Sequence, residues 1–199
     1  METRRMRRIR VYVAALAAML LPAGCSQPPM PRPYAYFRID LPEHAYTRCD
    51  VFSHCEFDMS AYAVANRREE QWAGKYDEWY NLDYPSLNGT IHLSYKKITP
   101  ETFQTVSEES YTLAYKHTIR ADAIEESLYA NDTARAFGIL YEMSGNAASP
   151  VQFFISDSTR HFIRGALYFN ALPNPDSIAP VSTYVEQDII RLIESLEWK

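Results

Sequence analysis

The stretch "VQFFISDSTRHFIRGALYF", residues 151–169, decides the fold class of this chain. Two apolar runs flank the polar tetrapeptide "DSTR", residues 157–160, and this pattern predicts two strands joined by a turn. Gly165 inside the second run predicts a β-bulge or a close approach of neighbouring backbone. The hairpin therefore predicts an antiparallel sheet.

Further strands are predicted on the N-terminal side of this hairpin. The run "ARAFGILYEM", residues 134–143, has the period of a half-buried strand, and "SGNAASP", residues 144–150, is a loop rich in turn formers. The same alternation occurs in "YAYFRIDL", residues 34–41, in "CEFDM", residues 55–59, and on both sides of Asn88-Gly89 in residues 78–98. Residues 63–78 carry charge clusters without a period, which predicts an exposed excursion.

Two long helices complete the predicted fold. Thr99-Pro100-Glu101 is a helix start, because threonine caps free backbone donors and proline fits the first turn. The inward face of that helix carries Phe103, Val106, Ser110, either Leu113 or Ala114, and His117. A second helix is predicted from Pro180, with the apolar stripe Val181, Tyr184, Val185, Ile189, Leu192, Ile193 and Leu196. The predicted class is α+β, a mainly antiparallel sheet with two long helices packed on it, which resembles the Mog1/PsbP-like arrangement.

The N-terminal segment has the features of an export signal. Residues 1–10 are basic, and the apolar run from Val11 to Leu21 is shorter than the roughly 20 residues that a transmembrane helix needs. Ala23-Gly24 before Cys25 resembles the lipobox of bacterial lipoproteins, whose cysteine carries acyl chains such as palmitate; Pro22 departs from that pattern. The alternative is an ordinary secretory signal peptide with an incidental cysteine.

The prolines after Cys25 predict an extended tether, since proline-rich segments favour the polyproline conformation. The predicted organisation is a lipoprotein signal peptide at residues 1–24, the lipidated cysteine and tether at 25–33, and a single periplasmic domain at 34–199. Ser26 and Gln27 match neither the aspartate of inner-membrane retention signals nor an acidic surface-export cluster. The periplasmic face of the outer membrane is therefore the favoured location, with the inner membrane as the alternative.

The charge of the exported chain argues against a nucleic-acid partner. Removal of residues 1–24 takes away five arginines and one glutamate, so the 20 basic and 25 acidic residues become 15 and 24, a net charge of −9. Phosphate recognition depends on lysine and arginine, which are the minority here.

Two cysteines remain after lipidation, in "CDVFSHC", residues 49–55. An even number in an oxidising compartment predicts a disulfide between Cys49 and Cys55. The alternative is two buried thiols; a metal site is disfavoured because no second cysteine or histidine cluster accompanies them.

No known reaction motif occurs in the chain, which predicts no catalytic, cofactor-binding or metal-binding residues. A site hidden from the sequence would draw on the polar residues in or beside regular elements, namely His117, Glu142, Asp157, His161 and Arg164. Fifteen tyrosines and nine phenylalanines fit use in the core and at interfaces better than catalysis.

Five segments of the chain carry a family likeness, namely "PRPYAYFRIDLPEHAY", "LNGTIHLSYKKI", "LAYKHTIRADAI", "YEMSGNAASPVQFFISDSTRHFIRGALYFN" and "DIIRLIESLEW". They resemble the gliding-motility lipoprotein GldD family of Bacteroidetes. The resemblance runs from about Pro31 to the end of the chain and is weakest between Ala63 and Glu78. It implies a non-enzymatic lipoprotein that acts with other envelope lipoproteins and subunits of the type IX secretion and gliding machinery.

Two functional hypotheses of different class follow. The first is a non-catalytic lipoprotein of the secretion or gliding complex, whose candidate contact surface is the loop with Ser144, Gly145, Asn146 and Ser149; the alternative role of this loop is a purely structural turn. The second is a periplasmic ligand-binding module or hydrolase acting on an envelope component. It predicts one pocket in which His117, Glu142, His161 and Arg164 converge.

Overall fold

The computed structural model describes Met6 and residues 38–68, 77–116, 121–171 and 174–199, of which residues 38–199 belong to one compact unit. The predicted signal peptide, Cys25, the tether and His117 lie outside the described residues. The boundaries predicted at residues 24, 33 and 34 therefore stay predictions.

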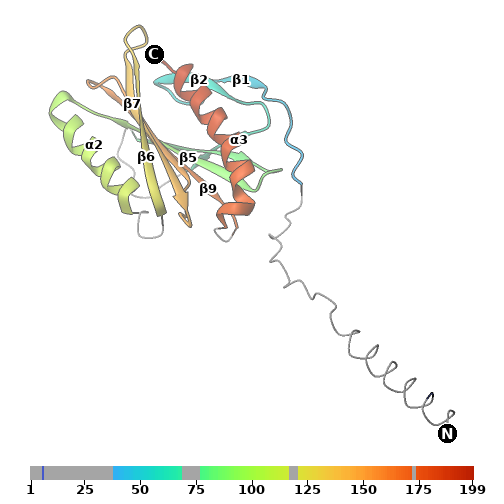
Figure 1. Ribbon diagram of the computed structural model, residues 1–199. Coiled ribbons are helices and arrows are strands. Elements are labelled where there is room, and N and C mark those ends of the chain that lie inside the picture. Colours follow the sequence, from blue (N-terminus) through green and yellow to red (C-terminus); the bar gives the residue numbers. More distant parts are fainter. Residues whose placement is uncertain (1–5, 7–37, 69–76, 117–120, 172–173) are drawn as a thin grey trace. The chain divides into compact units, whose positions relative to one another are not determined.

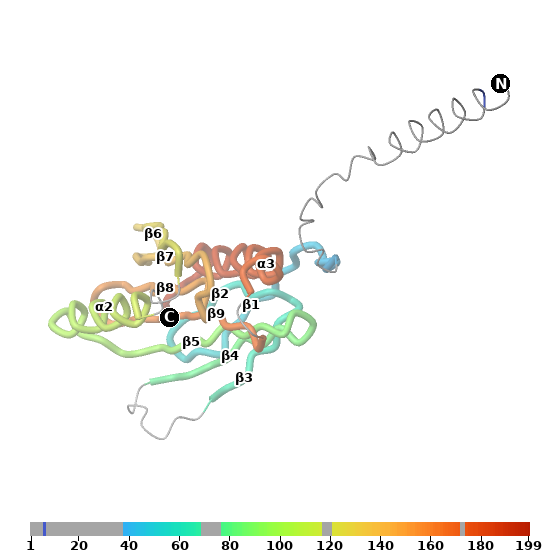
Figure 2. Tube along the Cα trace, turned by 60° about the horizontal axis from the view of Figure 1, so that its bottom comes forward, coloured from blue at the N-terminus to red at the C-terminus, as the bar shows by residue number. Residues whose placement is uncertain are grey.

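A seven-stranded antiparallel sheet forms the centre of the compact unit. Its spatial order is β3-β4-β5-β9-β8-β7-β6, and Figure 2 shows β3 and β4 at one end and β6 and β7 at the other. The strands are β3 (Val64–Arg68), β4 (Glu78–Tyr84), β5 (Gly89–Lys97), β6 (Ala121–Asn131), β7 (Ala136–Gly145), β8 (Val151–Ser156) and β9 (His161–Phe169).

Two helices and a small sheet cover this large sheet. They are α2 (Pro100–Tyr115), α3 (Pro175–Glu194), and a three-stranded sheet of order β1-β2-β10, with β1 (Tyr46–Cys49), β2 (Cys55–Ser60) and β10 (Glu197–Trp198). The large sheet runs between the two helices in Figure 1. The α+β class with two helices and mainly antiparallel sheets is confirmed.

Alternation along the strands separates two apolar cores. Phe153 and Ile155 of β8 belong to a core shared with α3 and the small sheet, whereas Phe154 belongs to a second core shared with α2. Because successive side chains of a strand point to opposite faces, α2 and α3 cover opposite faces of the large sheet.

The hairpin of β8 and β9 is confirmed, and its turn occupies residues 157–160. Gly165 lies directly opposite Phe153, and a Cβ added there would meet the Phe153 ring at 2.2 Å. The β9 pairings with β5 and β8 continue through Gly165 without a shift. The glycine therefore makes room for an aromatic ring rather than for a bulge.

One of the two predicted helix starts is confirmed, and the other is wrong. Thr99 caps α2 in a capping box with Thr102, as predicted. Ala114 is buried and Leu113 is exposed, so Ala114 is the residue on the inward face. The prediction that α3 begins at Pro180 is wrong, since Asn174 and Pro175 already supply a cap and a first-turn proline. The predicted apolar stripe of α3 is buried throughout.

Three strand predictions need correction. Arg38–Leu41 has no regular structure, and Ile39 is exposed, so alternation there reflects no buried face. Val64–Arg68 forms the edge strand β3, where an exposed excursion was predicted. The other edge strand, β6, was not predicted. Both edge strands are largely exposed, so burial imposes no apolar alternation on them.

Cys49 and Cys55 are both buried as free thiols in the core beside the small sheet. Burial raises the pKa of the Cys55 thiol to about 12, which makes it a poor nucleophile. The disulfide stays a prediction. Alkylation of the denatured protein with and without reductant, read by mass spectrometry, tests it, and oxidation of this short loop would add about 2 kcal/mol of stability.

Candidate interaction surface

The loop after β7 divides into structural and exposed residues. Gly145 has a φ of 87°, and a Cβ there would lie 2.7 Å from the Asp122 backbone nitrogen, so the loop needs glycine. Ser149 is fully buried, and its hydroxyl donates a hydrogen bond to the Val151 carbonyl at 3.3 Å. Ser144 and Asn146 are exposed, so of the four predicted contact residues only these two are free to meet a partner.

An apolar notch of about 220 Å³ separates this loop from the first turns of α3. Ala147, Ala148 and Pro150 form its loop side, and Pro175, Ile178 and Ala179 form its helix side. Asn174 holds the helix side in place, because its side chain accepts a hydrogen bond from the Ser177 backbone nitrogen at 3.4 Å. A notch of this size and lining fits one apolar side chain.

An acidic cluster of Glu125, Glu142 and Glu186 borders the notch. The three glutamates line a hollow of about 200 Å³ that shares Met143, Ser144, Pro150 and Ser182 with the notch. Burial, a hydrogen bond with Glu142, and the charges of Glu142 and Glu125 raise the pKa of Glu186 to about 7. The surface therefore combines an apolar notch with a carboxylate pair that shares a proton near neutral pH.

The raised pKa of Glu186 predicts a pH-dependent stability. The folded protein retains a proton that the unfolded chain loses above its ordinary pKa of 4.5, so the contribution of Glu186 to stability falls as pH rises from about 5 to 7 and then levels off. We expect a loss of about 1 kcal/mol, because solvent screens this partly buried group. Urea denaturation at several pH values measures it. Glu186→Gln should remove the loss, whereas Glu194→Gln, at an exposed position of the same helix, should retain it.

His161 lies in a different part of the domain from Glu142. Its Nδ1 is 2.9 Å from the Tyr95 hydroxyl, and its ring stacks on Trp198 with centroids 5.1 Å apart. Burial lowers the pKa of His161, which favours the neutral ring. The histidine borders a polar hollow of about 620 Å³ at the C-terminal end of the chain.

Asp157 caps the turn of the β8–β9 hairpin. Burial alone would raise its pKa, but the backbone N–H donors of Arg160, His161 and Thr159 and the Thr159 hydroxyl lower it to about 2. Its oxygens accept these hydrogen bonds at 2.7 to 2.9 Å. Asp157 therefore stabilises the turn and has a structural role.

Arg164 lies on the α2 side of the sheet, where its guanidinium donates to Gln152. Glu142, His161 and Arg164 thus occupy three separate places, and His117 lies outside the described residues. The convergent pocket expected for a hydrolase is not formed by the candidates that the structure describes. Within the described ranges, no group of three or more His, Cys, Asp or Glu side chains is arranged to hold a metal ion.

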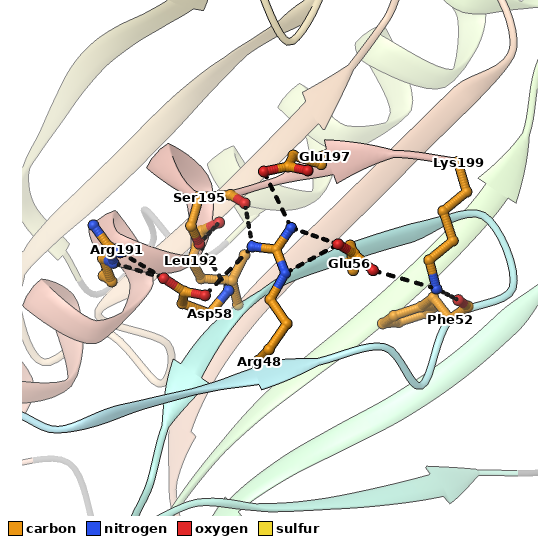
Figure 3. Close-up of polar contacts among 9 residues, drawn as sticks. All are labelled: Arg48, Phe52, Glu56, Asp58, Arg191, Leu192, Ser195, Glu197 and Lys199. Carbon is orange, nitrogen blue, oxygen red and sulfur yellow. Dashed lines mark hydrogen bonds and ion pairs between the residues drawn. The ribbon is translucent and has the colours of Figure 1, made fainter.

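An ion-pair network that the sequence did not predict joins the small sheet to the end of α3 (Figure 3). Arg48 donates to Glu56 at 2.8 Å, to Asp58 at 3.3 Å and to the Ser195 carbonyl at 3.0 Å. Arg191 of α3 donates to the same Asp58, so one carboxylate links two distant arginines. The hydrogen bond with Glu56 is the main cause that raises the pKa of Arg48. These charges pair with one another, so the network is explained by contacts between the small sheet and α3.

Within the described part of the chain, no helix combines the length and apolar character needed to cross a membrane.

Comparison with known proteins places this domain in a family. A search of curated proteins finds no match. The family model described as "Gliding motility lipoprotein GldD" matches residues 26–198, which includes both sheets and both helices. The chain therefore belongs to the family of gliding motility lipoproteins GldD.

Proposed function

We propose that this lipoprotein is a non-catalytic component that supports the assembly or function of the type IX secretion and gliding machinery. The observation that carries the proposal is the family match, which begins at residue 26, directly after Cys25. Acyl chains on Cys25 would anchor the protein, and the proline-rich segment would hold the acidic domain off the periplasmic face of the outer membrane.

The proposed contact surface is the notch together with the acidic cluster. Its chemistry fits an envelope protein that inserts one apolar side chain between the loop and α3 and places lysine or arginine beside Glu142 and Glu186. The hydrolase alternative lacks support, because Glu142, His161 and Arg164 lie apart.

The anchor is tested by affinity purification of the tagged protein from detergent-solubilised envelopes, with mass spectrometry of its partners and its N-terminus. The wild type should carry acyl chains and bring down other lipoproteins of the machinery, and Cys25→Ala should lose both. Density-gradient fractionation of the membranes identifies the membrane that holds the anchor. An unacylated wild-type N-terminus would refute the tether, and acylation without partners would refute the scaffold role.

The contact surface is tested by filling the notch. Ala148 is exposed and lines the notch, so Ala148→Arg should leave folding unchanged while it blocks the apolar anchor. We expect partner recovery to fall about tenfold, which corresponds to about 1.4 kcal/mol. Ala61→Arg, at an exposed turn between β2 and β3, is the matched control. Equal recovery by both variants would exclude this surface.

A further inference from the structure

The guanidinium of Arg164 is partly buried and lacks a carboxylate partner among the described residues. It lies on the α2 side of β9, opposite Ser94 of β5 and Phe154 of β8. Its one described hydrogen bond goes to the neutral Oε1 of Gln152 at 2.5 Å. Buried cations are costly when unpaired, so the contacts of the described residues do not explain this arginine.

Gln152 beside it has an unused donor. It is almost fully buried, at 1 % exposure, and its Nε2 has no hydrogen-bond partner among the described residues. Unsatisfied buried amides are costly, and such groups in native proteins call for an explanation. The Oε1 of Gln152 positions the Arg164 guanidinium, whose other N–H groups have no acceptor in the described part of the chain.

Arg164 also lines a cavity of about 150 Å³ between the sheet and α2, the helix on the left of Figure 1. Trp79 and Phe162 supply apolar surface from the sheet, and Val106 supplies it from α2. At about 30 Å³ for each water, the space corresponds to about five water molecules. Its occupant must therefore be small, with a polar end and an apolar side.

The two carboxylates that border the cavity do not neutralise Arg164. Glu109 lies 3.9 Å from Lys96, and Asp77 has interactions of its own. Burial lowers the pKa of Arg164, and the nearby Tyr168 raises it. Within the described residues, no ion pair neutralises the guanidinium at the cavity wall.

We propose that this cavity binds a small molecule through its oxyanion, a carboxylate or a phosphate, with Arg164 as the donor. Gln152 does not line the cavity, and its Oε1 holds the guanidinium in place. Guanidinium groups bind both oxyanions through paired, charge-assisted hydrogen bonds. The ring of Trp79 and the side chains of Phe162 and Val106 contact the apolar part of the ligand. The site lies on the opposite face of the sheet from α3, so it is independent of the proposed contact surface.

The proposal is tested on the purified full-length lipoprotein in detergent by calorimetric titration with benzoate, inorganic phosphate and chloride at matched ionic strength. We expect one saturable oxyanion site per chain and no response to chloride. Arg164→Gln should weaken binding at least tenfold, and Arg160→Gln, an exposed arginine of the same hairpin, should leave it unchanged. Benzoate binding alone would identify a carboxylate ligand, and phosphate binding alone would identify a phosphorylated one.

Arg164→Met separates a binding role from a structural one. In oxyanion-free buffer the loss of the charge and the loss of the hydrogen bond to Gln152 change the melting temperature of this variant in opposite directions, so binding is read from the effect of added oxyanion. Oxyanion should raise the melting temperature of the wild type only. The proposal is overturned if neither oxyanion binds the wild type, if Arg164→Gln binds as tightly as wild type, or if oxyanion raises the melting temperature of Arg164→Met as much as that of the wild type.

Discussion

The Gly138→Ala variant is expected to be strongly destabilised. Gly138 lies in β7, and a Cβ added there would stand 1.9 Å from the Phe154 carbonyl oxygen and 2.7 Å from Ile155 Cδ1. The carbonyl belongs to β8, a strand paired on both sides, so it cannot move without disturbing its ladders. We expect a cost of about 3 kcal/mol or more, a large share of the stability of an ordinary domain.

Urea denaturation followed by circular dichroism measures this loss. Gly89→Ala is the matched control, because Gly89 also lies in a strand. Its added Cβ would come closest to the edge of the Phe169 ring, at 3.0 Å, and not to a backbone atom. That ring is partly exposed and can turn, and the lower entropy of the unfolded chain offsets part of the cost. Equal midpoints for the two variants would refute the backbone clash.

Asp188→Ala is expected to cost about 2 to 3 kcal/mol. The carboxylate lies on α3 with 2 % exposure, accepts a hydrogen bond from the Tyr84 hydroxyl at 3.1 Å, and lies 2.7 Å from His44 Nδ1. Burial and the Asp188 charge raise the pKa of Tyr46 to about 12. Alanine would leave the buried Tyr84 hydroxyl without its acceptor.

A double-mutant cycle isolates the Asp188–Tyr84 bond. Tyr84→Phe should cost about 1 kcal/mol in the wild type and close to nothing in the Asp188→Ala background. In that background the Tyr84 hydroxyl has already lost its acceptor, so removing it breaks no further hydrogen bond. Asp188→Asn retains an acceptor and should be milder than Asp188→Ala. Additive effects in the cycle would show that Asp188 stabilises α3 by another route.

The sequence predicted the elements whose local pattern agrees with their burial. The β8–β9 hairpin and the Thr99 cap of α2 were placed correctly, because apolar alternation and capping chemistry act within a few residues. Edge strands were harder, since Leu128 of β6 is 84 % exposed and needs no apolar face. The segment Arg38–Leu41 alternates like a strand but pairs with none.

For the candidate sites too, the sequence indicated single residues but not the contacts between them. The sequence identified the loop around Gly145 and the residues Glu142 and Arg164, yet it did not indicate their neighbours. Glu186 beside Glu142, and Gln152 beside Arg164, are close only because strands and helices pack in one particular register. Asp188 also sits within the predicted apolar stripe of α3, where a carboxylate has no local explanation.

The sequence by itself indicated the family likeness, the α+β class and most regular elements, because these depend on patterns of residues close along the chain. Only the tertiary structure decided the arrangement of charges. Arg191 meets Asp58 across 133 positions, and His44 meets Asp188 across 144. Such pairs depend on how sheets and helices pack, and no local spacing encodes that packing.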